Sequence, residues 1–319
     1  MKKVVVIGGG SGIFNVLKGL KNYPVDITSI VTTFDNGGST GILRDEFGTL
    51  PQGDIRRSLI ALAPDTGDSI LRDMFNFRFP KDSSLHGHSF GNLFLQALTS
   101  ITGSDVGAIK KASDILNIKH KILPVSTDNC NLRAVLEDET IIKGETNIDI
   151  PKHDGEKQIK KLYLEPQATM FREAYDAILE ADLVIIGPGD LYSSIIPNVL
   201  VSGFTDAIDK TKGKVLYISN IMTKWGETNN FKASDFAKIL LSYLHREKIG
   251  YILCNNVPIE NYLKERYEKE KSFQVIPDTE ELAKYAGGIY ETDLLLQTED
   301  IIRHDPQKTA QVIMKILES

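Results

Sequence analysis

The first twenty residues of the chain constrain its fold more than any other stretch. Val4–Ile7 is an unbroken β-branched run that stops at the glycine cluster Gly8, Gly9, Gly10, Ser11 and Gly12. Apolar residues then recur at helical spacing from Ile13 to Leu20, which predicts strand, glycine loop and helix in that order. Glycines let backbone N–H groups approach a ligand, and a helix N-terminus adds partial positive charge. The stretch therefore predicts a seat for a phosphate group.

Neither of two common glycine motifs matches this cluster. The dinucleotide pattern G-x-G-x-x-G fails, because Ile13 or Asn15 stands where the third glycine is required. No Gly-Lys-Ser/Thr follows, so the cluster is not a Walker A loop. The alternative interpretation is a glycine turn that only packs the first helix tightly on the first strand. Four glycines among five residues favour phosphate binding over packing alone.

Two further loops follow predicted strands. The β-rich run Ile27–Thr33 ends close to Asp35, where an acidic residue often meets a ribose hydroxyl. The apolar strand Leu183–Ile186 ends at the glycine turn Gly187-Pro188-Gly189, and a helix is expected from about Pro197. A doubly wound parallel sheet places two such glycine loops on either side of its switch point. We therefore expect both glycine loops to border one crevice at the carboxyl ends of the strands.

Asp35 and Asp54 are candidate metal ligands. Each lies on a predicted loop near the carboxyl end of the opening strands. Two such carboxylates can share a hard cation such as Mg²⁺, which in turn bridges phosphates. In the alternative interpretation, Asp54 only caps a helix that begins at Ile55. The residues leave both interpretations open.

Gly37–Gly41 matches the G-x-S-x-G pattern of a hydrolase nucleophile, with Ser39 at its centre. The context favours a small hydroxyl that donates to phosphate. Asp35 and Asn36 separate Ser39 from the strand, no clear helix follows at once, and no histidine stands out as its base. His86 and His88 are two residues apart but have no adjacent acid or thiol, which disfavours a metal site.

Composition narrows the class of protein. The 319 residues carry a net charge of −6, which argues against non-specific nucleic-acid binding. Two cysteines, Cys130 and Cys254, suggest neither a disulfide framework nor a zinc site. No basic-then-apolar leader and no apolar run near the ~20 residues of a membrane span are present. We expect a cytoplasmic protein without membrane insertion.

The remaining pattern predicts one α/β domain over residues 1–319, with a doubly wound, mostly parallel sheet. Leu132–Leu136 and Thr140–Lys143 form a hairpin-like pattern, and Tyr163-Leu164 adds a further strand. We expect a small antiparallel elaboration inserted at about residues 130–168. The tail from Glu280 to Ser319 is expected to be mostly helical.

Several motifs together resemble the gluconeogenesis factor (YvcK/CofD-like) family, and the likeness covers essentially the whole chain. The motifs are Val-Ile-Gly-Gly-Gly-Ser-Gly at 6–12, Asp-Asn-Gly-Gly-Ser-Thr-Gly-Ile-Leu-Arg at 35–44, Gly-Asp-Ile-Arg at 53–56, Gly-Asn-Leu at 91–93, Gly-Pro-Gly-Asp-Leu-Tyr-Ser-Ser at 187–194, Asn-Ile-Met-Thr at 220–223, Gly-Glu-Thr at 226–228 and Arg-His-Asp-Pro at 303–306.

The resemblance implies a Rossmann-like fold and two kinds of function. One branch consists of regulatory proteins linked to gluconeogenic growth and cell shape, which bind a uridine-diphosphate sugar such as the N-acetylglucosamine form. The other branch, 2-phospho-L-lactate transferases, moves a phospholactyl group from a guanosine nucleotide to a deazaflavin with Mg²⁺. In that branch the acids that match Asp35 and Asp54 are the expected metal ligands. The family usually has two consecutive acids where this chain has Asp35-Asn36, and a Gln-Pro pair where it has Lys224-Trp225.

Our first hypothesis is a nucleotide-sugar-binding regulatory protein without turnover. The two glycine loops would hold the diphosphate; the residues expected around the phosphate, the ribose or the pocket are Asp35, Gly38, Ser39, Arg44 and Asn92. The rival hypothesis is a transferase in which Asp35 and Asp54 hold Mg²⁺ and Arg44 or Arg56 stabilises charge on the leaving phosphate. A third hypothesis, an NAD-binding oxidoreductase, rests on analogy of fold alone. A homo-oligomer is compatible with each hypothesis.

Overall fold

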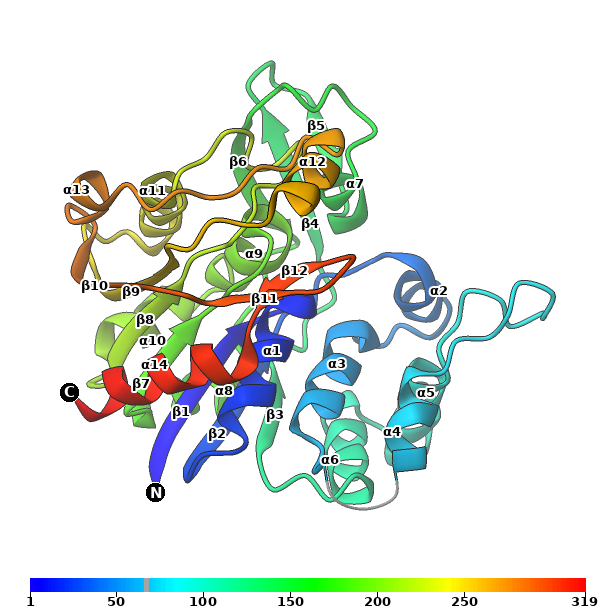
Figure 1. Cartoon of the computed structure of the whole chain (residues 1–319). Helices are drawn as coiled ribbons and strands as arrows, with labels where there is room; N and C mark the ends of the chain where they lie inside the picture. The colour runs from blue at the N-terminus through cyan, green and yellow to red at the C-terminus, as the bar shows by residue number, and fades with distance from the viewer. Residues whose placement is uncertain (66–68) are drawn as a thin grey trace.

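The computed structural model describes residues 1–65 and 69–319 of the chain (Figure 1). These residues form a central seven-stranded sheet in the order β10-β9-β8-β7-β1-β2-β3, with every neighbouring pair parallel. Its strands are β1 (Lys2–Gly8), β2 (Val25–Val31), β3 (Lys121–Pro124), β7 (Leu183–Ile186), β8 (Lys214–Ile218), β9 (Ile249–Asn255) and β10 (Ala286–Thr292).

The direction of winding reverses between β1 and β7. The chain moves outward from β1 through β2 to β3, returns beside β1 as β7, and then continues outward through β8 and β9 to β10. This arrangement is a doubly wound sheet with its switch point between β1 and β7. The predicted fold class, a Rossmann-like α/β protein with a mostly parallel sheet, is confirmed.

The unbroken apolar run of β1 follows from burial on both faces. Val4 and Val6 pack in the core on one face of the sheet, and Val5 and Ile7 pack in the core on the other. All four side chains are at most 2% exposed. A strand covered by helices on both sides needs apolar residues at every position, because successive side chains point to opposite faces.

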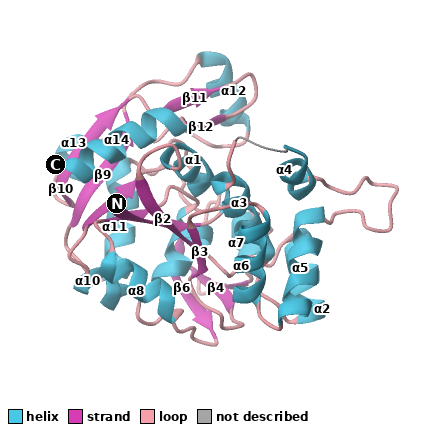
Figure 2. Ribbon diagram, turned by 90° about the horizontal axis from the view of Figure 1, so that it is seen from below, coloured by secondary structure: helices cyan, strands magenta, loops and turns pink. Residues whose placement is uncertain are grey.

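Helices cover both faces of the sheet, as Figure 2 shows from below. The first core lies on the face of Val4 and Val6, and the second core lies on the face of Val5 and Ile7. Helices that pack in the first core include α1 (Gly10–Leu20), α3 (Gln52–Leu62), α5 (Phe90–Thr102), α6 (Asp105–Ile115) and α14 (Pro306–Glu318). The second takes in α8 (Arg172–Glu180), α9 (Ile196–Val199), α10 (Phe204–Lys210) and α11 (Ala233–Leu244). The other helices are α2 (Gly38–Phe47), α4 (Ser69–Asn76), α7 (Glu145–Asp149), α12 (Asn261–Lys269) and α13 (Thr279–Leu282).

A small antiparallel sheet interrupts the parallel fold. Its order is β5-β4-β6, formed by β4 (Asn131–Leu136), β5 (Ile141–Lys143) and β6 (Ile159–Glu165). Along β4 buried and half-buried residues alternate, because one face packs on the second core. The predicted hairpin and the further strand are both present, and α7 lies between β5 and β6.

The expectation of a mostly helical tail is wrong. Residues 286–292 form the edge strand β10, and a short antiparallel ribbon follows, made of β11 (Leu295–Gln297) and β12 (Ile302–His304). The pair Gly287-Gly288 interrupts the run of β-branched and aromatic residues from which a strand would be predicted. A methyl group on Gly287 would lie 2.9 Å from the carbonyl oxygen of Gly250, so the close approach of β10 to β9 requires the residue type that normally breaks a strand.

Candidate functional site

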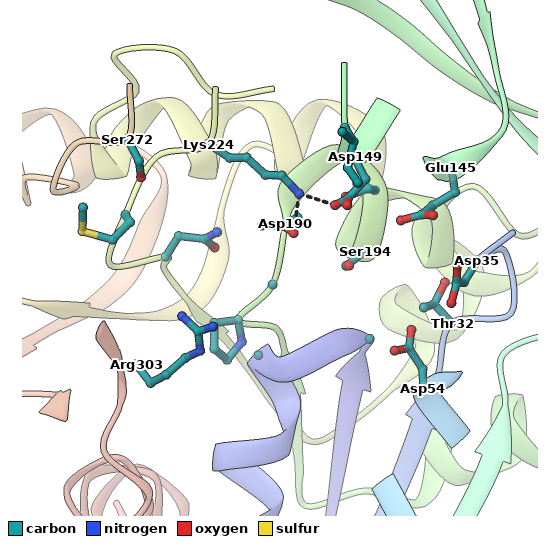
Figure 3. Close-up of a pocket in the computed structure, with 18 of the residues that line it drawn as sticks. Thr32, Asp35, Asp54, Glu145, Asp149, Asp190, Ser194, Lys224, Ser272 and Arg303 are labelled. Carbon is teal, nitrogen blue, oxygen red and sulfur yellow. Dashed lines mark hydrogen bonds and ion pairs between the residues drawn. The ribbon is translucent and has the colours of Figure 1, made fainter. Parts of the chain in front are cut away.

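A cavity of about 550 Å³ lies at the carboxyl ends of the central strands (Figure 3). Loops after β1, β2, β7 and β8 line it, together with α7 and β12. The position is the switch point, where doubly wound sheets bind their ligands. The volume falls within the range of small-molecule sites. The cavity is therefore the candidate functional site.

The two glycine loops form one wall of this cavity. Gly9 and Gly12 belong to the loop and helix after β1, and Pro188 and Gly189 belong to the turn after β7. Gly187 has φ of 71°, a left-handed conformation that favours glycine, and it turns the chain out of β7. The expectation that both loops border one crevice is confirmed.

Three carboxylates form one end of the cavity. Asp35 follows β2, Asp54 lies in the first turn of α3, and Glu145 is the first residue of α7. Figure 3 shows these side chains grouped around Thr32. Because they come from three separate elements, the fold itself brings their negative charges together.

The protonation of this acidic end is shifted by burial. Burial raises the pKa of Asp35, although the N–H of Gly37, which donates to its Oδ1 at 2.8 Å, opposes the shift. Burial, followed by the charges of Asp35 and Asp149, raises the pKa of Glu145 to about 9. Glu145 therefore takes up a proton more readily than an ordinary glutamate, whereas a cation bound among these acids would favour its ionised form.

Asp54 does not cap a helix that begins at Ile55. Helix α3 begins at Gln52, so Asp54 lies within its first turn, where the helix dipole favours an acid. Its Oδ1 is 3.8 Å from a guanidinium nitrogen of Arg57. Asp54 also lines the cavity, so the first turn of α3 presents its carboxylate to a ligand.

The acidic end fits a hard cation. Asp35, Asp54 and Glu145 offer the oxygen ligands that Mg²⁺ prefers. The Thr32 hydroxyl is buried at 3% exposure and has no hydrogen-bond partner in residues 1–65 and 69–319, so it offers another oxygen at the same place. The donor set is therefore suitable for the Mg²⁺ that the family resemblance implies.

A second acidic group surrounds Lys224. Its ammonium nitrogen lies 2.8 Å from Asp190 and 3.3 Å from Glu227, and it is also hydrogen-bonded to Asp149. Burial lowers the pKa of Lys224, but the charges of Glu227, Asp190 and Asp149 outweigh burial and raise it above its ordinary value. Lys224 is therefore a fixed positive charge in the cavity wall.

The opposite end of the cavity carries little net negative charge. His304 is buried, and its Nε2 lies 3.1 Å from the carbonyl oxygen of Ser219. Burial lowers the pKa of His304 to about 4, so the ring is neutral at neutral pH and Nε2 donates to that oxygen. Asn220, Arg303 and Ser272 also line this end. It offers neutral hydrogen-bonding groups and one guanidinium.

Ser39 lies outside the cavity lining and is buried in α2. That helix begins at Gly38, so the expectation that no helix follows the glycine loop at once is wrong. The Ser39 hydroxyl is 3.0 Å from Nδ1 of His88 and accepts from Nδ2 of Asn92 at 3.2 Å. Asn92 in turn accepts from Arg56. These residues form a buried hydrogen-bond chain behind the cavity wall.

Arg44 is also absent from the lining within the described residues. Its guanidinium donates to the side chains of Asn129 and Asn131 and to the carbonyl oxygen of Cys130. Arg44 therefore ties α2 to the start of β4. The cationic side chain near Asp54 in the cavity is Arg57 instead.

Of the other predicted site residues, only some line the cavity. Gly38 lines the cavity, whereas Gly8 and Gly187 are not among the described residues that line it. Gly10 and Ser11 form the start of α1.

Sequence reasoning missed much of the charged lining. Glu145 and Asp149 come from α7, a short helix inside the antiparallel elaboration, and no local pattern relates them to the glycine loops. Asp190 could have been predicted as a site residue, because it directly follows the Gly-Pro-Gly turn. Lys224 lies between the motifs at 220–223 and 226–228, and Arg303 is the first residue of the motif at 303–306. That both residues line the cavity depends on the tertiary fold.

Fold and site define an α/β protein with a polar, mixed-charge ligand cavity at the switch point of a doubly wound sheet. The chain belongs to the CofD family: the family model for 2-phospho-L-lactate transferase CofD matches residues 4–295.

Relatives that are about 40% identical to this chain are named gluconeogenesis factors. A gluconeogenesis factor of Halalkalibacterium halodurans is 40% identical over 315 residues, covering 98% of this chain and 96% of the relative. One of Bacillus subtilis is 40% identical over 317 residues, covering 99% and 98%. The crystal structure of a UPF0052 family member from Bacillus halodurans has a TM-score of 0.93 at 39% identity and covers 98% of this chain and 100% of that one.

In the part of the chain that the structure describes, no helix combines the length and apolar character needed to cross a membrane.

Proposed function

We propose that this protein is a cytoplasmic regulatory protein of the gluconeogenesis factor kind that binds a nucleotide sugar, such as UDP-N-acetylglucosamine, without turning it over. The observation that carries this proposal is the single wall made by the two glycine loops at the switch point. Backbone N–H groups there, together with the start of α1, are suited to a diphosphate. The names of the relatives support the regulatory role.

The chemistry of the cavity suggests how such a ligand would lie. The diphosphate would contact Gly9, Gly12 and Gly189. Ionised carboxylates accept hydrogen bonds from hydroxyl groups, so Asp35 and its neighbours suit a sugar or ribose. The base would lie toward the neutral end near Asn220, whose buried Oδ1 has no partner among the described residues.

Binding without turnover would make the protein a sensor. The family resemblance links this kind of protein to growth on gluconeogenic carbon sources and to cell shape. A sensor of a nucleotide sugar would connect carbon metabolism with the use of that sugar in wall synthesis. In this proposal, the bound and ligand-free states differ in their contacts with a downstream partner.

The second candidate is a Mg²⁺-dependent transferase that resembles 2-phospho-L-lactate transferase. The specific observation in its favour is that Asp35 and Asp54 line the same cavity as the glycine loops. A metal ion held there would neutralise charge that develops as a phosphoester bond breaks. Arg57, which lines the cavity beside Asp54, is placed to assist. Asn36, neutral where the family usually has an acid, favours the sensor.

One experiment separates these candidates. The purified protein is titrated with uridine, guanosine and nicotinamide nucleotides, and the ligand that binds is incubated with Mg²⁺, with and without a deazaflavin acceptor. The sensor returns its ligand intact in mass spectrometry. Cleavage or transfer that disappears in Asp54→Asn would make the protein an enzyme, because removing one metal-binding carboxylate costs turnover more than binding.

A further inference from the structure

Residues 77–90 form an arm that extends from the body of the molecule between α4 and α5 (Figure 1). Its base is a short ribbon, in which the backbone N–H of Phe79 donates to the carbonyl oxygen of His88 at 3.1 Å. Its tip is closed by backbone hydrogen bonds of turns within residues 80–88. The arm is therefore a preformed element, which can bind another surface at a low cost in conformational entropy.

The exposed side chains of the arm are apolar and basic. Phe77 is 50% exposed and Leu85 is 40% exposed. Arg78 and Lys81 are also exposed, and neither forms an ion pair with a described residue. Two cations and one acid, Asp82, give the arm a net charge of +1 on a chain whose net charge is −6. The arm therefore suits an acidic surface that also exposes hydrophobic side chains.

Such a surface lies on the last turns of α2. Ile42 is 50% exposed and Phe47 is 51% exposed. Asp45 and Glu46 lie between them and are exposed, without an ion pair in residues 1–65 and 69–319. The last turn of a helix carries partial negative charge, so two acids there attract a cation from elsewhere. These four residues, which we call the α2 surface, complement the arm in charge and in apolar character.

The arm and the α2 surface belong to one side of the molecule. Nδ1 of His88, at the base of the arm, lies 3.0 Å from the hydroxyl of Ser39 in α2. Figures 1 and 2 both show the rest of the arm extending past the neighbouring helices. Ile42 and Phe47 stay half exposed, so the arm of a chain does not cover the α2 surface of the same chain. Two complementary patches on one side of a chain can instead meet between two copies related by a two-fold axis.

We propose that a second copy of this chain binds this side of the molecule, and that the arm of each copy lies on the α2 surface of the other. The contact is reciprocal, so it occurs twice in the dimer and leaves no open end. The cations of the arm then meet the acids of the α2 surface, and the exposed hydrophobic side chains of both patches are covered. This inference does not depend on which ligand the cavity binds.

The test measures molar mass by sedimentation velocity over a range of protein concentrations. We expect the wild type to form a dimer of twice the 35.5 kDa chain mass. An arm variant carries Arg78→Glu and Lys81→Glu, and an α2 variant carries Asp45→Lys and Glu46→Lys. Each variant places like charges in both contacts, so we expect its dissociation constant to rise at least about tenfold.

A matched control carries Lys212→Glu and Lys248→Glu. These two exposed lysines precede β8 and β9, away from both patches, and their replacement changes the net charge as much as the arm variant does. The control should dimerise like the wild type. A dimer that the control weakens as much as the arm variant does depends on net charge alone, and this result would overturn the proposal.

A mixture of the arm variant and the α2 variant gives the most specific result. In a reciprocal contact the two reversed patches face each other, and so do the two unchanged patches, which places opposite charges in both contacts. We therefore expect the mixture to form a dimer although each variant alone is largely monomeric. A monomeric wild type, variants that dimerise like the wild type, or a mixture that stays monomeric overturns the proposal.

Urea unfolding shows whether each variant is folded before the masses are compared. If a double variant does not fold, the single changes Lys81→Glu and Glu46→Lys are measured alone and mixed in the same way. The expected and the contradicting results are then the same as for the double variants.

Discussion

Gly12 lies against the carbonyl oxygen of Pro188: a methyl group at Gly12 would come within 2.0 Å of that oxygen. The first helix and the second glycine turn are therefore in direct backbone contact. Gly19, at the other end of the same helix, stands in the same relation to the carbonyl oxygen of Pro306, also at 2.0 Å. One contact lies at the cavity and the other lies at α14.

This pair of glycines provides a matched test of the cavity wall. Gly12→Ala and Gly19→Ala each force a backbone shift, and we expect each to lower the free energy of unfolding by about 1–3 kcal/mol. Only Gly12→Ala should also weaken ligand binding, because it displaces the 187–189 turn. Urea unfolding and calorimetric titration measure the two effects. Equal loss of affinity in both variants would mean that the wall has no special role.

Arg44 is expected to matter for stability and not for ligand contact. Replacing it with leucine leaves the carbonyl oxygen of Cys130 and the side chains of Asn129 and Asn131 without their donor. We expect a loss of about 1–3 kcal/mol in the free energy of unfolding. Affinity measured well below the melting temperature should stay at the wild-type value. Lost affinity with unchanged stability would restore Arg44 as a phosphate ligand.

His304 predicts a dependence of stability on pH. Burial lowers its pKa to about 4 from an ordinary value of 6.5. Between these values the unfolded chain binds a proton that the folded chain does not, so this residue lowers stability as pH falls from 6.5 to 4. The slope is about 1.4 kcal/mol per pH unit. His304→Gln, which can keep a donor for Ser219, should flatten this part of the curve.

Urea unfolding at pH 7 and pH 4.5 measures this effect. The stability difference between the two pH values should be smaller in His304→Gln than in the wild type. The same difference in both proteins would show that His304 titrates normally in the folded state.

Local patterns were enough to predict the framework of the site. The β-branched run Val4–Ile7 and the Gly-Pro-Gly turn at 187–189 each mark a buried strand that ends in a tight turn. Because parallel strands carry their loops on one edge, two such units already imply a shared crevice. The close packing of Gly12 on Pro188 is a physical reason for a glycine at position 12.

The chemistry inside the crevice was less predictable, because it depends on contacts between distant parts of the chain. Asn36 accepts hydrogen bonds from the backbone and the hydroxyl of Thr146, 110 residues away, and this contact brings Glu145 beside Asp35. No periodicity in the sequence encodes such a contact. Helix α2 was missed for a local reason, since three glycines at 37–41 are typical of a loop.

The most direct test of the central claim is a calorimetric titration of UDP-N-acetylglucosamine into the wild-type protein, once with EDTA and once with Mg²⁺. Backbone N–H groups of the glycine loops need no metal to hold a diphosphate, so we predict saturable binding of one ligand per chain in EDTA. Asp54→Asn should keep that affinity. Absence of binding, or binding that requires Mg²⁺ and is lost in Asp54→Asn, would contradict the account.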